Sequence, residues 1–342
     1  MILATTTERG ECAGHFRLTV LNPGGRDPAQ DFSRENSPNE KEHAPVNFHA
    51  YAACTGGTFQ RDTKSVLAAG LPVLLLLRGD FRETQRALEK LKRHGLTVVV
   101  SLKETGLHQI ARQLAKPKPL ARFREILRAA DGSLAATPEA LAFYGGGEFI
   151  PTPYPLHDPA WDFSRSLGER RGIFIGTREW DVPSRQHLAA LTIAAQLGEP
   201  ITVFDEDPKR CRAILAALGV APETLRVLNR RLPYRVYLAE VARHRIVLQA
   251  DRSAVPGQVA GDALLCRMPC VGGDGAIDRL AFPSTCGFGR SLGELRDLAA
   301  RLLRDSEFYA MTVAESQRDG RDKLGFAATA QRLADFFARV AR

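Results

Sequence analysis

Residues 245–274, RIVLQADRSAVPGQVAGDALLCRMPCVGGD, carry the strongest pattern in this chain. The pattern predicts a buried strand, a loop that leads into a helix opened by Gly257 and Gly261, and a second strand after Pro269. A glycine-opened helix after a parallel strand directs free backbone N–H groups and the positive end of the helix dipole toward one point, which suits a phosphate. Asp262 follows one turn later, where a carboxylate can meet the hydroxyls of a ribose or a sugar. The segment therefore indicates a nucleotide-sugar site.

Short apolar segments alternate with helical patterns in both halves of the chain. In the second half we predict strands at 172–176, 201–204, 225–229 and 246–250, with helices at 181–197, 207–218 and 234–244. In the first half we predict strands at 2–6, 46–53, 71–77, 96–102 and 133–136, with helices at 81–94, 119–130 and 138–144. Short apolar strands separated by helices favour parallel sheets with helices on both faces. The predicted fold class is therefore α/β, with two Rossmann-like domains that face a cleft.

A proline-rich stretch, FIPTPYPLHDP at residues 149–159, separates the two halves. Prolines keep such a segment extended and stiff, so we place the inter-domain linker at about residues 151–170. We expect an N-terminal domain at 1–160, a second domain at 161–325 and a C-terminal segment at 326–342. Ligands of such sheets bind beyond the carboxyl ends of the strands, which places the expected site in the cleft.

The composition is that of a globular protein, with 342 residues, 44% hydrophobic residues and a formal net charge of +8. The basic residues are scattered, and the chain has neither a basic recognition helix nor aromatic residues interleaved with arginine, so nucleic acid is not an expected partner. Six cysteines form no CxxC pair and lack matching histidines, which speaks against zinc. We find no signal peptide and no apolar run that could span a bilayer. We expect a cytoplasmic protein, either free or peripheral at the inner membrane face.

The second half resembles the nucleotide-binding domain of GT-B glycosyltransferases, and in particular the retaining family-four-like enzymes (glycosyl transferases group 1). The likeness rests on GIFIGTREWDVPSRQHLAAL (172–191), ITVFDE (201–206), the segment 245–274 and LGELRDLAARLLRD (292–305). In the first half it is a likeness of topology only. The resemblance implies two Rossmann-like domains around a cleft, and a C-terminal helix, residues 326–340, that crosses back to the first domain.

The resemblance also implies where a nucleotide-sugar donor binds. The amides from Gly257 to Gly261, with Gln258 between them, would hold the diphosphate, and Asp262 would bind the ribose. At Ala254 the chain departs from the family, which has a glutamate there that contacts the donor sugar. Either Asp251 or Gln258 replaces it, or the donor is bound differently, or the protein does not transfer sugar.

Cations are expected near the diphosphate, because a metal-free site must stabilise the leaving group with fixed donors. Arg178 and Arg185 occupy places comparable to a family arginine and lysine, and arginine suits the task through its two-pronged guanidinium. The alternative is that both are solvated surface residues. The nucleobase would lie beyond the predicted strand 225–229, near Asn229 and Tyr234, where a ring could stack on the tyrosine. The alternative there is ordinary loop polarity.

The first half is expected to bind the acceptor. Glu104 and His108 follow the predicted strand 96–102 and lie one helical turn apart. If transfer inverts the anomeric centre, one of them could be the general base; if transfer retains it, they would position the acceptor. The alternative is that each is a helix cap or a solvated group.

Two further stretches of the first half are candidates. The loop 5–17 resembles the glycine-containing loop that these enzymes use near the donor phosphate and the acceptor. Its candidate residues are Gly10, Gly14, His15 and Arg17. The stretch 112–128, RQLAKPKPLARFREILR, combines basic residues with apolar residues at helical spacing. It is either a membrane-surface or lipid-diphosphate acceptor patch, or a solvated helix that covers the core.

The preferred hypothesis is a glycosyltransferase that uses a UDP-sugar or GDP-sugar as substrate, without a metal or other cofactor, and a glycan, lipid-linked or protein acceptor. The triplet Asp205-Glu206-Asp207 resembles a metal-binding DxD, but it precedes a proline and reads as a helix cap. The first alternative is a catalytically silent partner or a glycan- or nucleotide-binding protein of the same fold, and Ala254 supports it. The second alternative is a nucleotide-sugar epimerase.

Overall fold

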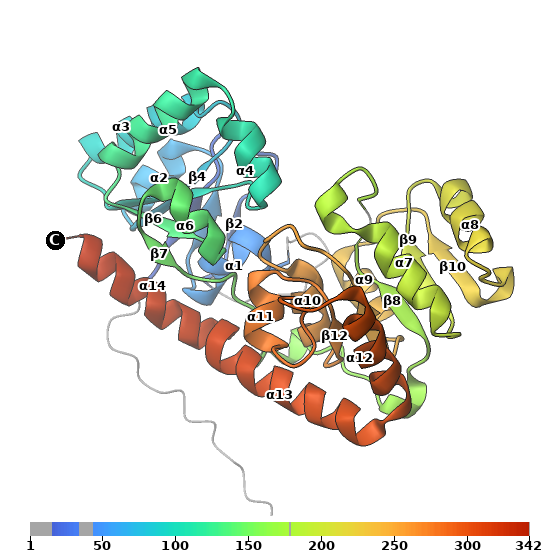
Figure 1. Cartoon of the computed structure of the whole chain (residues 1–342). Coiled ribbons are helices and arrows are strands. Elements are labelled where there is room, and N and C mark those ends of the chain that lie inside the picture. The colour runs from blue at the N-terminus through green and yellow to red at the C-terminus, as the bar shows by residue number, and fades with distance from the viewer. Residues whose placement is uncertain (1–15, 34–43, 178, 342) are drawn as a thin grey trace, which may run out of the picture.

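The computed structural model describes residues 16–33, 44–177 and 179–341, which form two lobes, each built on a mainly parallel sheet with helices on both faces (Figure 1). The strands of the first sheet, in spatial order, are β2 (Gln30–Asp31), β3 (Thr58–Gln60), β1 (Thr19–Leu21), β4 (Val73–Leu77), β5 (Val98–Leu102), β6 (Gly132–Ala135) and β7 (Glu148–Phe149). Those of the second are β10 (Leu225–Leu228), β9 (Ile201–Phe204), β8 (Ile173–Ile175), β11 (Ile246–Leu248) and β12 (Cys270–Val271). This arrangement confirms the predicted α/β class with two Rossmann-like domains.

Strand β4 shows how the first sheet acquires two apolar faces. The helices of the first lobe are α1 (Asn47–Cys54), α2 (Thr63–Ala69), α3 (Arg82–Arg93), α4 (Leu107–Leu114), α5 (Pro117–Ala129) and α6 (Leu141–Tyr144). All five residues of β4 are buried. Leu75 belongs to the core that Leu88 of α3 and Phe123 of α5 complete, whereas Leu74 belongs to the core that contains Tyr51 of α1. Alternate strand residues therefore serve opposite helix layers.

The second lobe repeats this arrangement. Its helices are α7 (His187–Gln196), α8 (Pro208–Ala217), α9 (Tyr234–Val241), α10 (Gln258–Leu265), α11 (Ala276–Ala281), α12 (Leu292–Arg304) and α13 (Ser306–Leu324). On β8, Phe174 packs in the core formed by α9, α10 and α11, while Ile173 and Ile175 pack in the core formed by α7 and α12. All neighbouring strands of this sheet are parallel, so their carboxyl ends meet at one edge.

The C-terminal helices join the two lobes. Helix α13 runs along the second lobe, and α14 (Phe326–Val340) continues from it across to the first (Figure 1). There Phe336 and Phe337 of α14 join the core that contains Phe48 of α1. The linker follows the same route, because Tyr154 pairs with Gly325, and the N–H of Tyr154 donates to the carbonyl of Leu324 at 2.8 Å. The predicted C-terminal crossing is thus confirmed.

Two secondary-structure predictions need comment. Residues 46–53 alternate like a strand but form α1, which is buried on nearly every side, so no polar face reveals its helical period. The predicted first strand, residues 2–6, lies outside the described residues, and the first described strand is β1. Among the described residues, no helix is long and apolar enough to span a membrane.

Candidate functional site

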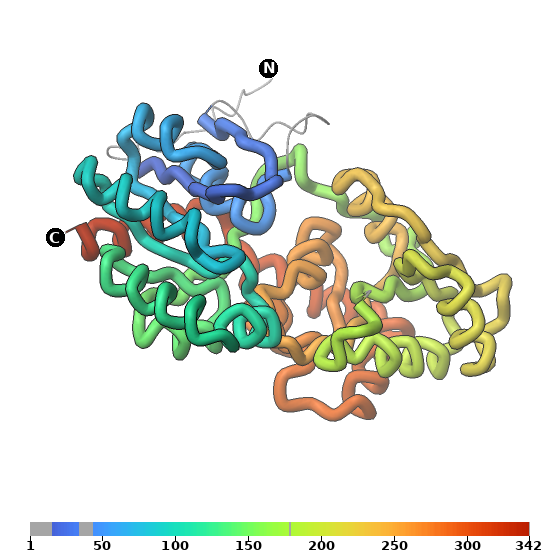
Figure 2. The backbone as a smooth tube through the Cα atoms, turned by 90° about the horizontal axis from the view of Figure 1, so that it is seen from above, coloured from blue at the N-terminus to red at the C-terminus, as the bar shows by residue number. Residues whose placement is uncertain are grey.

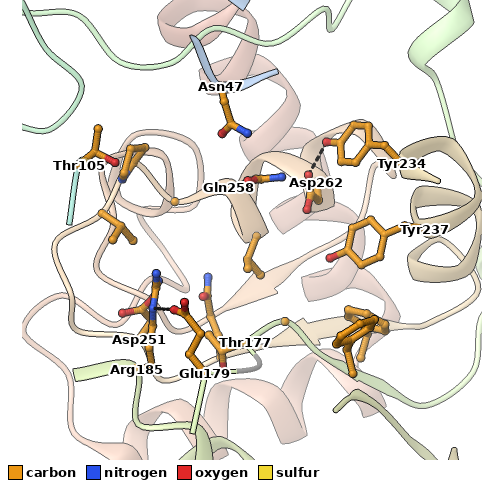
Figure 3. A pocket seen from close by; sticks show the side chains of 18 of the residues that line it. Asn47, Thr105, Thr177, Glu179, Arg185, Tyr234, Tyr237, Asp251, Gln258 and Asp262 are labelled. Carbon is orange, nitrogen blue, oxygen red and sulfur yellow. Dashed lines mark hydrogen bonds and ion pairs between the residues drawn. The ribbon is translucent and has the colours of Figure 1, made fainter. Parts of the chain in front are cut away.

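A cavity of about 420 Å³ lies between the lobes, at the carboxyl ends of the second sheet's strands. Its walls come mainly from the loops after β8, β10 and β11 and from α9 and α10, and the first lobe adds Asn47, Thr105 and Gln109. Tyr234, Tyr237 and Asp262 lie at one end, and Arg185, Glu179 and Asp251 lie at the other (Figure 3). The cavity therefore occupies the position at which open parallel sheets bind their ligands.

The start of α10 supplies free backbone donors to this cavity. Gly257 precedes the helix with φ +93°, a left-handed conformation that favours glycine. A Cβ atom there would stand 2.6 Å from Oδ2 of Asp278, which is buried. Within the described residues, the N–H groups of Gln258 and Val259 have no hydrogen-bond acceptor, and both residues line the cavity. This end of the helix can bind an anion.

Asp262 lies one turn into α10 and is almost fully buried. Its carboxylate accepts a hydrogen bond from the Tyr234 hydroxyl at 2.5 Å and a second one from Tyr237. Burial raises the pKa of Asp262 to about 7, against the lowering effect of these two hydrogen bonds. The carboxylate is thus an acceptor whose charge changes near neutral pH.

At the other end of the cavity, Arg185 is held by two carboxylates. It ends a 3₁₀ turn, Pro183–Arg185, and its guanidinium pairs with Glu179 at 2.7 Å and with Asp251. Asp251 is buried, and its other oxygen accepts the N–H of Ser253 at 2.8 Å. Arg185, which lies in the segment that follows β8, is therefore already paired with two acids.

The remaining wall of the cavity is apolar and aromatic. It comprises Phe174 of β8, Phe204 of β9 and Tyr237 of α9, which we call the aromatic end. The rings of Phe174 and Tyr237 meet edge to face, with centroids 5.8 Å apart. A flat ring of a ligand can stack or pack here. Sequence reasoning missed Phe174 and Phe204, because apolar strand residues look alike whether they face a core or a cavity.

Comparison with known proteins places this architecture. No family model and no curated protein matches the sequence. Among solved structures, the chain is similar to Anabaena HepE in complex with UDP and glucose (TM-score 0.61, 13% identity, 95% of this chain and 100% of that one). It is also similar to sucrose-phosphate synthase from Thermosynechococcus elongatus (TM-score 0.64, 13% identity, 95% of this chain and 99% of that one). A third similar structure is a UDP-forming trehalose-phosphate synthase from Burkholderia xenovorans (TM-score 0.61, 10% identity, 96% of this chain and 100% of that one). The chain has the GT-B fold.

Within this GT-B fold, the prediction for Gly261 was wrong in its reason. The N–H of Gly261 donates to the carbonyl of Gly257 at 3.1 Å, as a helical residue does, so it is not available to a phosphate. A Cβ at this position would stand 2.1 Å from the hydroxyl oxygen of Tyr154. Glycine is needed here because the linker packs against the helix.

The prediction for the nucleobase loop needs a similar correction. Asn229 is exposed and does not line the cavity; Arg231 and Leu232 line it instead. Tyr234 does line it, but its hydroxyl is bonded to Asp262, and its ring packs near Trp161 and Tyr237. The first residues after β10 are exposed, and the chain reaches the cavity only at Arg231, shortly before α9 begins.

The structure does not place the predicted catalytic pair, Glu104 and His108, in the wall of the cavity. Glu104 is exposed, His108 is half-buried, and neither lines the cavity. Their neighbours Thr105 and Gln109 do. The loop also touches the second lobe, because the N–H of Leu107 donates to the carbonyl of Ser253 at 3.4 Å. Helix α4 begins at Leu107, within the stretch that we expected to be a loop. This helical turn changes which side chains face the cavity.

Of the loop candidates of the first lobe, the structure describes only Arg17, and it does not place this residue at the cavity. Arg17 precedes β1, so it lies at the amino end of the strands, away from the cleft, and donates to the carbonyl of Gly56 at 2.9 Å. The glycines that follow β1 are Gly24 and Gly25. Gly10, Gly14, His15 and Arg178 lie outside the described residues.

Two further predictions concern Ala254 and Gln258. Ala254 is nearly buried, has φ +47°, and its N–H donates to Asp274 at 3.2 Å, so no side chain reaches the cavity from it. Gln258 is exposed and lines the cavity.

Asp207 caps α8, as expected, by accepting the N–H of Arg210. Among the described residues, no group of three or more His, Cys, Asp or Glu is arranged to hold a metal ion.

Proposed function

We propose that the protein is a glycosyltransferase that moves a sugar from a UDP-sugar donor to a hydroxyl group of an acceptor. The observation that carries this proposal is the inter-lobe cavity, which is lined by the start of α10 with its free amides, by the Asp262 carboxylate and by the Arg185 guanidinium (Figure 3). The similar structure of HepE contains UDP and glucose, and the similar trehalose-phosphate synthase is UDP-forming, which supports UDP as the nucleotide.

The cavity's chemistry changes from one end to the other in the order that such a donor requires. The aromatic end would receive the base, and Asp262 would accept the ribose hydroxyls. The amides of Gln258 and Val259 would bind the diphosphate. The donor sugar would then extend toward Thr105 and Gln109 of the first lobe, where the acceptor can approach.

Departure of the diphosphate creates negative charge, which the α10 amides and Arg185 can stabilise as fixed donors. These donors make transfer without a metal ion part of the proposal. The first-lobe residues that line the described cavity, Asn47, Thr105 and Gln109, are neutral. They can orient an acceptor hydroxyl but not take its proton. As the bond from the anomeric carbon to the diphosphate breaks and the bond to the acceptor oxygen forms, the proton would pass to the departing diphosphate.

An assay with UDP-sugars tests this proposal against its alternatives. We expect the protein to release UDP from a UDP-sugar, by transfer or slow hydrolysis, and to retain this activity in EDTA. Conversion of the UDP-sugar to a different UDP-sugar without UDP release would indicate an epimerase. Binding of UDP with no turnover for any sugar and acceptor would indicate a silent partner.

A peripheral membrane contact is a further part of the proposal. The apolar residues of α5 pack into the core, so only its charges remain for a partner. Among the exposed cations on α4 and α5, none of Arg112, Lys116, Lys118, Arg124 and Arg128 forms an ion pair with a described residue. Such a cluster attracts anionic lipid headgroups. We expect sedimentation with vesicles that contain phosphatidylglycerol, but not with phosphatidylcholine alone, and loss of the association in high salt.

A charge-matched pair of variants makes this expectation specific. The variant Lys116→Gln/Lys118→Gln/Arg124→Gln should no longer sediment with the anionic vesicles. A control that neutralises three exposed cations of the second lobe should sediment like the wild type. That control is Lys209→Gln/Arg212→Gln/Arg321→Gln. If both variants lost sedimentation with the vesicles equally, net charge alone would explain the association. That result would contradict a contact through α4 and α5.

A further inference from the structure

The Arg185 cluster carries more negative than positive charge. One guanidinium pairs with two carboxylates, those of Glu179 and Asp251, and all three residues line the cavity. A UDP diphosphate would add at least two negative charges at this end. Because charges of like sign repel strongly in a partly desolvated cavity, Arg185 cannot serve the phosphates while both carboxylates remain in place.

The two carboxylates differ in how firmly they are held. The side chain of Asp251 is 5% exposed and also accepts the N–H of Ser253, so its departure would leave a buried donor without a partner. The side chain of Glu179 is 48% exposed, and among the described residues Arg185 is its sole hydrogen-bond partner. Glu179 can return to water at little cost, since exposed ion pairs contribute little.

The backbone beside Glu179 is anchored independently of this ion pair. The indole N–H of Trp180 donates to Asp205 at 2.9 Å, and the ring meets the buried His187 edge to face at 4.4 Å between centroids. Arg210 lies over the other part of the ring, with its guanidinium carbon 4.9 Å from the centroid. A rotation of the Glu179 side chain therefore leaves the loop itself in place.

We propose that Glu179 is a removable counter-ion: in the donor-free protein it occupies Arg185, and the donor's diphosphate displaces it. This inference rests on the proposed function, since it assigns Arg185 to the phosphates of a UDP-sugar. Glu179 then lowers the affinity for UDP, because each binding event must break the Glu179–Arg185 pair. By re-forming that pair, Glu179 also favours the release of UDP after transfer.

Calorimetric titration of Glu179→Gln with UDP and with uridine tests the inference. We expect the variant to bind UDP about fivefold more tightly than the wild type, because the diphosphate no longer has to displace a carboxylate from Arg185. Binding of uridine, which has no phosphate, should not change. The control Glu89→Gln removes the same charge from the exposed face of α3 and should leave both affinities unchanged.

A double-mutant cycle identifies the partner of Glu179. In an Arg185→Gln background, Glu179→Gln should change UDP affinity less than about twofold, because the ion pair is already absent. Unchanged or weaker UDP binding by Glu179→Gln in the wild-type background would overturn the inference. Weaker binding of UDP-glucose with tighter binding of UDP would also overturn it, since Glu179 would then hold the donor sugar. A wild-type protein that binds no UDP would instead refute the proposed function.

Discussion

Gly257→Ala is expected to weaken UDP binding by roughly tenfold or more and to destabilise the protein by about 2–4 kcal/mol. The left-handed φ of +93° opposes any side chain, and the added carbon would meet Asp278 at 2.6 Å. Asp278 cannot move aside, because Gly273 and Gly275 also pack closely against its carboxyl group, and Gln249 donates to it at 2.8 Å. The start of α10 must shift, and its free amides shift with it.

Gly198→Ala is the matched control for this prediction. Gly198 also has a left-handed φ, +69°, but no atom lies within 4 Å of the position that its Cβ would take. We expect a loss of about 1 kcal/mol from backbone strain and no change in UDP affinity. Titration calorimetry and thermal unfolding separate the two effects. Wild-type UDP affinity in folded Gly257→Ala would contradict the assignment of the diphosphate to this helix end.

Asp262→Asn is expected to weaken UDP binding about tenfold, because it removes a charged acceptor for the ribose hydroxyls. The substitution is nearly isosteric, so the Tyr234 hydroxyl can still donate to the remaining side-chain oxygen. In the wild type, UDP affinity should rise as the pH increases through about 7, where Asp262 ionises. UDP titrates in the same way with either protein, so the difference between their affinity profiles reports on Asp262. Parallel profiles would contradict this role.

The pKa of Asp262 also predicts a pH dependence of stability. Burial raises this pKa from 3.8 in the unfolded chain to about 7 in the folded protein. Between these values the folded protein binds more protons than the unfolded chain, so its stability falls as the pH rises. The loss attributable to Asp262 is on the order of a few kcal/mol, and it should be absent in Asp262→Asn. pH 5 lies about one unit inside this window and pH 8 about one unit above it. Denaturant unfolding at these two pH values measures the difference in the free energy of unfolding.

The sequence was sufficient for the fold because local pattern and global architecture agree in this chain. Strand β4 is a continuous apolar run, β5 is apolar except for Ser101, and helices such as α3 show a clear polar face. Helix α1 was mistaken for a strand because its burial on nearly all sides hides the helical period.

The candidate site was predictable only where backbone chemistry determines it. The helix that begins at Gly257 and the acid at 262 follow from the order of strand, glycine and helix. The side chains that face the cavity depend on rotations within a turn, and so Thr105 and Gln109 took the places expected for Glu104 and His108. The pairing of Arg185 with two acids is a tertiary contact that no local pattern encodes.

The measurement that tests the central claim most directly is calorimetric titration of the wild-type protein and of Gly257→Ala and Asp262→Asn with UDP. The account predicts one UDP bound per chain, with affinity reduced in both variants. It would be contradicted by a wild-type protein that does not bind UDP, or by binding that neither substitution affects.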